Sequence, residues 1–442
     1  MRSKVLWVLL FLLGPWSSTA AADNRFVVRA PSGSAALQQL CLTLGCNVAG
    51  GLDGSLGKLF LVTAPSLVDP NAFLQLLRSQ PGITNVEPDS ILKVMQAAAS
   101  APPSSLYDTI PVNYFGVTVW HGYAGQPATT IIRLPDVQSA YGVTGAGIVA
   151  VIDTGVDPTQ PVLQSILPGS ASPQSILVAG YDFTRNIPGS ASELNDVNQS
   201  SVGVSTSPAY VNQSSMAIVD QTSALNFQQP QYAAFGHGTM VAGIIHLVAP
   251  TAQIMPLKAF SADGSGYLSD ILRAIYFAVQ NGASVINMSF SLYGYSEELG
   301  RATKFATTHQ LICVASAGND GKEEYVYPAA YAAVMGIAST SNNDTLSSFS
   351  NYGNDLVWVA APGEGIVTTY PFGTYAAGWG TSFSTAMVSG AAALLLSVRN
   401  TCNESCAERS LAHAVPISSA VGNGRVDVYQ AVAAMRQTQG PN

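Results

Sequence analysis

The sequence predicts an α/β protein built on a doubly wound, mostly parallel sheet with helices on both faces, preceded by a small α+β domain. From residue 134 onward, short and fully apolar segments alternate with helical patterns, which is typical of parallel strands covered on both sides. The composition agrees, because 48% of the 442 residues are hydrophobic and only 10% are charged. A typical soluble domain carries about 25% charged residues, so this chain can bury a large core.

The small domain covers residues 23–95. Asp69 followed by Pro70 is a typical helix start. The expected strands are 25–30, 58–63 and 86–94, and the expected helices are 35–44 and 70–79. Residues 96–133 are expected to form a linker, rich in Ala, Ser and Pro up to residue 106, followed by strand-like segments at 112–120 and 129–133.

The large domain extends from residue 134 to residue 436. Its helices are expected at 135–141, 238–246, 268–282 and 297–309, and its strands at 147–153, 253–259, 284–289, 311–315, 334–338 and 356–360. Residues 158–235 interrupt this alternation with Ser, Asn, Gln and Pro. We interpret them as a long surface insertion with one strand, at 176–183.

The net charge and the N-terminal segment indicate which classes of protein the sequence excludes and where the protein is expected to act. With 18 basic and 26 acidic residues, the net charge of −8 argues against nucleic-acid binding, which needs a basic surface. Residues 1–22 have the pattern of a signal peptide: Arg2 and Lys4, a ten-residue apolar segment and three alanines at 20–22. That segment is too short to span a membrane, which takes about 20 residues. We therefore expect a secreted protein, extracellular or periplasmic, with no membrane association after signal removal.

The five cysteines are too few for a disulfide framework. Cys402 and Cys406 are close enough in sequence to pair, and so are Cys41 and Cys46. Cys313 lies in an apolar segment, so we expect it to be buried.

Three segments carry side chains suited to acyl transfer. Asp153 ends an apolar strand in V-I-D-T-G, His237 precedes a helix in G-H-G-T-M, and Ser382 starts a helix in G-T-S-F-S. A serine hydroxyl is a poor nucleophile until a base removes its proton; an imidazole can do this near neutral pH, and a carboxylate fixes the imidazole tautomer. A helix N-terminus at Ser382 also directs unpaired N–H groups toward a developing oxyanion.

In this order, the three segments resemble those of the subtilisin-like serine proteases. The resemblance runs from about residue 134 to 434 and includes A-S-A-G-N around Asn319, N-M-S around Ser289 and G-N-G-R-V-D-V-Y-Q-A-V near the C-terminus. It implies a subtilisin-like fold, an acyl-enzyme intermediate and polypeptide substrates. Asp153 matches the family's orienting carboxylate, His237 its general base and Ser382 its nucleophile. Asn319 matches the side-chain donor of the oxyanion hole, beside the Ser382 backbone N–H.

Other positions follow from the same resemblance. The residues that match the strand that pairs with substrate are Ser289, Phe290 and Ser291. Ser384 matches a small helix residue and Asp157 a turn residue, so neither is expected to react. The resemblance implies no cofactor for catalysis. The chain is short where many relatives hold a calcium-binding loop, so any structural calcium site is unassigned.

The small domain resembles the inhibitory propeptide of the same family, with G-I-T-N-V-E-P-D-S as its last strand. This implies a precursor inhibited by its own propeptide and cleaved between about residues 95 and 110. The alternative is an unrelated N-terminal domain that the mature protein keeps.

Two other functions fit parts of the pattern. An aspartic protease also carries D-T-G, but its mechanism needs two such carboxylates, and the sequence has no second D-T-G or D-S-G. A catalytically inactive binding protein on a protease fold is the remaining alternative. Such a protein would be expected to have lost one of Asp153, His237, Ser382 or Asn319, and all four are present.

Overall fold

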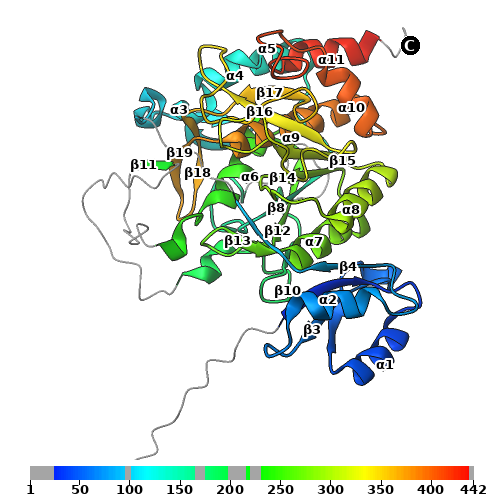
Figure 1. Cartoon of the computed structure of the whole chain (residues 1–442). Coiled ribbons are helices and arrows are strands. Elements are labelled where there is room, and N and C mark those ends of the chain that lie inside the picture. The colour runs from blue at the N-terminus through cyan, green and yellow to red at the C-terminus, as the bar shows by residue number, and fades with distance from the viewer. Residues whose placement is uncertain (1–23, 95–100, 165–174, 198–215, 220–229, 438–442) are drawn as a thin grey trace, which may run out of the picture. The chain divides into compact units, whose positions relative to one another are not determined.

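The computed structural model describes the chain apart from residues 1–23, 95–100, 165–174, 198–215, 220–229 and 438–442, so the expected signal peptide lies outside the described residues. The described chain divides into two compact units (Figure 1). The smaller consists of residues 24–51 and 57–88, and the larger of residues 52–56 and 89–437.

The smaller unit is an α+β fold. Its antiparallel sheet has the order β2-β3-β1-β4, and helices α1 and α2 share one core with it, in which the Phe26 and Phe73 rings lie 5.5 Å apart. Asp69 caps α2 by accepting from the Ala72 N–H at 2.7 Å, as the sequence predicts. The elements are β1 (Asn24–Arg29), α1 (Ser34–Leu44), β2 (Asn47–Gly51), β3 (Leu59–Ala64), α2 (Pro70–Arg78) and β4 (Asn85–Pro88).

The expectation of one strand over 86–94 is wrong. β4 ends at Pro88, and a second strand, β5 (Ile91–Lys93), belongs to the larger unit. Between them, Asp89 accepts hydrogen bonds from the Ser269 N–H at 2.7 Å and from the Ser269 hydroxyl at 2.8 Å. β5 pairs antiparallel with β13 (Ser265–Tyr267).

The larger unit confirms the predicted fold class. Its eight-stranded sheet has the order β10-β9-β12-β8-β14-β15-β16-β17 (Figure 1), and every pair from β9 to β17 is parallel. The strands are β8 (Ile148–Asp153), β9 (Tyr181–Asp182), β10 (Ile187–Pro188), β12 (Gln253–Lys258), β14 (Val285–Met288), β15 (Ile312–Ser316), β16 (Met335–Thr340) and β17 (Val359–Pro362). Of the strand expected at 176–183, only β9 and a single bridge from Leu177 to Ile254 form.

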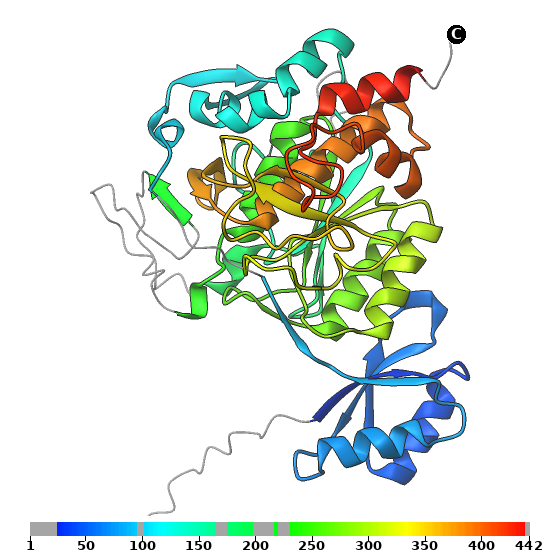
Figure 2. The same cartoon turned by 45° about the horizontal axis from the view of Figure 1, so that its top comes forward.

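Both faces of this sheet are buried. Val149 and Val151 share a core with helices α6 (His237–Val248) and α9 (Thr381–Val398), whereas the alternate residues Ala150 and Ile152 face the other way and are also fully buried. Helices α7 (Leu268–Gln280) and α8 (Glu297–Thr308) pack against each other and against the sheet (Figure 2). Helix α9 is long and apolar enough for a membrane span, but it is a core helix with 89% of its residues buried.

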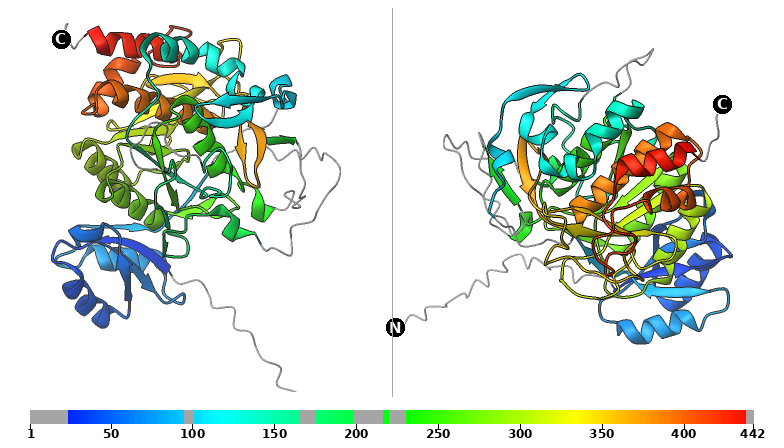
Figure 3. Two further views of the ribbon diagram at one scale, coloured as in Figure 1. Left: turned by 180° about the vertical axis from the view of Figure 1, so that it is seen from behind. Right: turned by 90° about the horizontal axis from the view of Figure 1, so that it is seen from above.

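The segment before the sheet packs onto α6 and a small antiparallel sheet. Strands β18 (Ile366–Tyr370) and β19 (Thr374–Gly378) pair with each other, and β19 pairs with β11 (Met216–Val219). Trp120 stacks on Tyr375 at 4.4 Å, so the hairpin of β6 and β7 lies beside β19 (Figure 3). The elements of this segment are β6 (Pro111–Tyr114), β7 (Val117–Trp120), α3 (His121–Ala124), α4 (Pro127–Ile131) and α5 (Leu134–Tyr141).

The expectation of a strand at 129–133 is wrong, because residues 129–131 belong to helix α4. Their consecutive β-branched residues favour a strand by propensity. Pro127 at the helix start and the Thr129 hydroxyl, which donates to the Gln126 carbonyl at 2.8 Å, stabilise the first turn instead.

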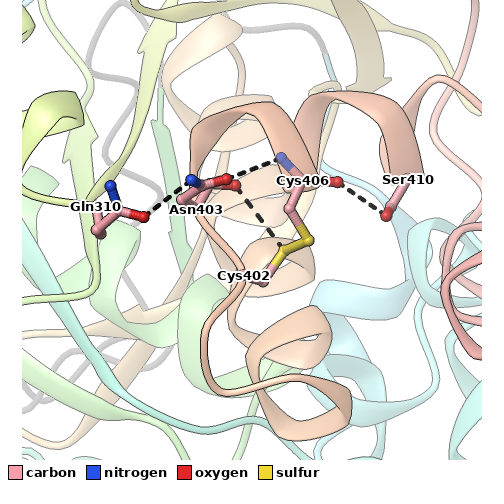
Figure 4. Close-up of a disulfide and its surroundings, with 5 residues drawn as sticks. All are labelled: Gln310, Cys402, Asn403, Cys406 and Ser410. Carbon is pink, nitrogen blue, oxygen red and sulfur yellow. Dashed lines mark hydrogen bonds between the residues drawn. A yellow bond between two sulfur atoms is a disulfide. The ribbon is translucent and has the colours of Figure 1, made fainter. Parts of the chain in front are cut away.

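The two pairs that are close in sequence, Cys41–Cys46 and Cys402–Cys406, both form disulfides. Cys313 is free and buried, as expected. The Cys402–Cys406 bridge closes the first turn of α10 (Glu404–Leu411), which precedes α11 (Val428–Gln437) (Figure 4). Asn403 caps α10 by accepting from the Cys406 N–H at 3.2 Å, and its amide donates to Gln310 at 2.9 Å. The bridge and the cap fix the start of α10, and the hydrogen bond to Gln310 joins it to the segment that follows α8.

Candidate active site

The three side chains suited to acyl transfer come from three elements of the larger unit. Asp153 is the last residue of β8, His237 is the first residue of α6 and Ser382 is the second residue of α9. All three are buried. β8 and the two helices share one core, so the fold brings these positions together from distant parts of the sequence.

Asp153 and His237 form a direct pair. The Asp153 Oδ1 atom lies 2.8 Å from His237 Nδ1 and also accepts from the Thr154 N–H at 2.7 Å. A carboxylate only accepts hydrogen bonds, so Nδ1 carries the imidazole proton. His237 Nε2 is buried and has no hydrogen-bond partner among the described residues. In the neutral imidazole with its proton on Nδ1, Nε2 is the nitrogen that can act as a base.

Ser382 lies at the start of α9. Its hydroxyl donates to the Ser289 carbonyl at 3.3 Å rather than to His237. The His237 ring lies 5.7 Å from the ring of Phe383, the next residue along α9. The imidazole is thus beside the helix start that carries the Ser382 hydroxyl.

Asn319 follows β15 and is held against the same helix start. Its side-chain oxygen accepts from the Thr381 N–H and the Thr381 hydroxyl, each at 2.9 Å. Because its oxygen is committed to α9, the amide is fixed in one orientation. The first N–H groups of a helix have no partner within the helix, so this place can stabilise negative charge.

Ser289, Phe290 and Ser291 directly follow β14. The Ser289 hydroxyl accepts from Asn287 at 2.9 Å and donates to the Ser382 carbonyl at 3.1 Å. The Phe290 ring is fully buried against Phe260 at 5.1 Å, so only its backbone is placed to meet a peptide. Ser291 donates its N–H to the Lys93 carbonyl at 3.2 Å.

Strand β5 of the same chain is hydrogen-bonded beside residues 289–291. β5 pairs through Lys93 with Ser291 on one edge and with Ser265 of β13 on the other. The Val94 N–H extends this ladder by donating to Gly264 at 2.9 Å. The Leu92 and Val94 side chains are buried, whereas Lys93 is exposed. An extended peptide with alternating buried side chains therefore lies between β13 and the segment that contains Ser291.

The two residues expected to be unreactive have structural contacts. The Ser384 hydroxyl is buried and donates to the Ala361 carbonyl at 2.8 Å. Asp157 is buried, with one oxygen accepting from the Thr159 N–H and hydroxyl and the other from the Phe372 N–H at 2.8 Å. Asp157 thus ties the loop after β8 to the turn between β18 and β19.

Glu193 is a buried residue next to the Asp153–His237 pair that the sequence did not predict as part of the site. It lies in the segment 158–235, which we interpret from its sequence as a surface insertion. Its carboxylate accepts from the Gly236 N–H at 2.8 Å, next to His237, and from Thr154, next to Asp153. Burial raises the pKa of Glu193 to about 8. One signal was available: four of the five charged residues of 158–235 fall within 182–196.

The described residues contain no group of three His, Cys, Asp or Glu side chains that could hold a metal ion. The structure therefore assigns no calcium site within them.

Comparisons with known proteins identify the family of the larger unit. Residues 145–431 match the model of the subtilase family. The chain is similar to subtilisin BL of Lederbergia lenta (40% identity over 36% of this chain and 62% of the relative) and to thermitase of Thermoactinomyces vulgaris (38% identity over 45% and 75%). It is also similar to the thermophilic serine proteinase of Bacillus sp. strain AK1 (34% identity over 63% and 59%). The match to subtilisin BL thus covers less than two thirds of that relative.

Proposed function

The chain belongs to the subtilase family, and from this premise we propose that it is a secreted serine endopeptidase made as a self-inhibited precursor. The observation that carries the proposal is the buried Asp153–His237 pair, 2.8 Å apart, beside the helix start that holds Ser382. The similarity to subtilisins and thermitase supports polypeptides as the substrates. No cofactor enters the proposed chemistry.

In the proposed mechanism, Ser382 is the nucleophile. Its hydroxyl turns from the Ser289 carbonyl toward His237 Nε2, which takes the proton as Oγ attacks the scissile carbonyl. Asp153 keeps the Nδ1–H tautomer and stabilises the imidazolium. The imidazolium then protonates the leaving amine, and water hydrolyses the acyl-enzyme by the same steps.

Asn319 and the Ser382 backbone N–H are the proposed oxyanion donors. The Thr381 contacts fix the Asn319 oxygen on α9 and so set the orientation of the amide, whose N–H would donate to the oxyanion. Donors fixed before the reaction stabilise the developing negative charge without reorganisation.

Residues 289–291 are the proposed partner of the substrate backbone. β5 supports this role, since it already forms an antiparallel contact with Ser291 and a ladder with β13. A substrate strand would form the same hydrogen bonds. β5 therefore acts in the precursor as a peptide that blocks the site.

This contact motivates the propeptide proposal. The smaller unit directly precedes β5 in the sequence, and the proposed propeptide covers residues 23–95. Cleavage shortly after Val94 would free the strand partners of β5 for substrate. Residues 1–22 would direct export, and the two disulfides agree with an oxidising compartment.

Ser382→Ala tests the proposal. We expect it to abolish hydrolysis of a chromogenic peptide while leaving the thermal unfolding midpoint near that of the parent, because only one hydroxyl is lost. Ser384→Ala, which removes a buried hydroxyl from the same helix, is the matched control and should remain active. Equal activity in Ser382→Ala would refute the mechanism. Inertness of the processed parent protein toward all peptides would favour the inactive binding protein, and inhibition by pepstatin would favour an aspartic protease.

A further inference from the structure

A carboxylate from the long insertion lies behind the Asp153–His237 pair. Glu193 begins a short 3-10 helix (Glu193–Asp196) and is fully buried. We propose that Glu193 is a positioning residue that fixes the two segments carrying Asp153 and His237 and strengthens Asp153 as the partner of the imidazolium. This inference rests on the proposed serine endopeptidase function.

The contacts of Glu193 reach both segments. One carboxylate oxygen accepts from the Gly236 N–H at 2.8 Å and lies 3.2 Å from the Thr154 hydroxyl. The other oxygen is hydrogen-bonded to the Thr239 hydroxyl, in the first turn of α6. One side chain therefore holds the residue after Asp153, the residue before His237 and the first turn of the helix that starts at His237.

The insertion itself is anchored at this place. The Val156 N–H donates to the Ala191 carbonyl at 2.9 Å, and Gly155, at φ +102°, leaves no room for a side chain against Glu193. Asp196 accepts from the buried Lys258 ammonium at 2.7 Å, and Lys258 is the register partner of Asp153 in the sheet. Glu193 is thus fixed on a rigid support rather than carried on a free loop.

The Thr154 hydroxyl links the two carboxylates. It lies 3.2 Å from Glu193 and 3.3 Å from Asp153 Oδ1, and it has one proton to donate. When Glu193 is ionised, it competes with Asp153 for that proton. Asp153 then accepts fewer hydrogen bonds, so more of its negative charge is available to stabilise the imidazolium of His237. The charge of Glu193 also favours the imidazolium that forms on His237. Both effects lower the barrier to proton transfer.

This arrangement has a pH signature. Burial is the main cause that raises the pKa of Glu193 to about 8; the Thr239 and Gly236 hydrogen bonds and Lys258 oppose it, and Asp157 adds to it. The protonated form predominates below this value, so kcat should rise as the pH passes about 8. Three titratable groups interact electrostatically with Glu193: Asp157, Lys258 and Tyr370. Three more are linked to it through one residue: Asp153 through Thr154, Asp196 through Lys258, and His237 as the neighbour of Gly236.

Glu193→Gln tests the inference in the processed enzyme. We expect kcat at pH 9 to fall roughly tenfold or more with KM unchanged, because small displacements of catalytic groups are costly, and the rise near pH 8 to disappear. Glu193→Asp should keep the pH-dependent rise at reduced kcat. The low-field proton NMR signal of His237 Nδ1–H should shift in Glu193→Gln, which is a readout independent of turnover.

The matched control is Glu404→Gln. Glu404 is also buried with a raised pKa, but it accepts from the Cys313 N–H in a different part of the larger unit. Loss of the pH 8 step in both variants would indicate a general effect of buried charge and overturn the inference. Parental kcat and pH profile in Glu193→Gln, with Ser382→Ala inactive, would also overturn it while leaving the proposed function standing. Activity in Ser382→Ala would instead overturn the proposed function.

Discussion

At the scale of single residues, the proposed chemistry depends on groups whose orientation is set by neighbours. Asn319 is the clearest case, because Thr381 holds its oxygen on α9. Asn319→Ala should lower kcat roughly 10²–10³-fold with little change in KM, since the donor acts on the oxyanion and not on bound substrate. Steady-state kinetics on a peptide substrate measures both constants. A raised KM with unchanged kcat would make Asn319 a binding residue instead.

At the scale of elements, one glutamine joins the segment before the sheet to the small antiparallel sheet. The Gln126 amide donates to the Val367 carbonyl at 2.7 Å and its oxygen accepts from the Val367 N–H at 2.9 Å. Gln126→Ala leaves both backbone groups buried and unpaired, which should cost about 1–3 kcal/mol for each group. Urea unfolding should show this loss, and Gln164→Ala, at an exposed glutamine, should not. Equal unfolding curves for the two variants would contradict the role of Gln126.

Some elements of the fold and the site could be predicted from the sequence, and others could not. Segments such as 148–152 are apolar throughout because both sheet faces are buried, so the parallel strands could be predicted from these segments and their alternation with helical patterns. The Thr and Ile run at 129–132 favours a strand by propensity, but Pro127 and the packing of Gln126 favour a helix. The motifs around Asp153, His237 and Ser382 are short sequence patterns, so these three candidate residues could be predicted from the sequence. Glu193 lies in an insertion without a motif, and its contact with Thr239 of α6, 46 residues further along the chain, is predicted by no local pattern.

At the scale of the whole molecule, the proposed precursor has to fold and stay inactive before cleavage. A parallel sheet is dominated by non-local contacts and folds slowly, so a preceding domain can assist it. A separate fragment of residues 23–95 should inhibit the processed enzyme, because it carries β5, and the Ser382→Ala precursor should keep full length after signal removal. Inhibition assays and mass spectrometry of purified protein measure these outcomes. A fragment without Leu92, Lys93 and Val94 is the control and should inhibit far less.

Normal maturation of the purified Ser382→Ala precursor would contradict self-processing. Failure of the 23–95 fragment to bind or inhibit would make the smaller unit a retained domain of the mature protein. Neither result would bear on the nucleophile.

The nucleophile itself is tested most directly by covalent labelling. A phosphonate or sulfonyl fluoride reagent forms a stable bond with an activated serine, and peptide mapping by mass spectrometry locates the adduct. The proposed mechanism predicts one adduct per molecule, on Ser382, that is lost in His237→Ala. An adduct on Ser384, or an active enzyme that takes up no label, would contradict it.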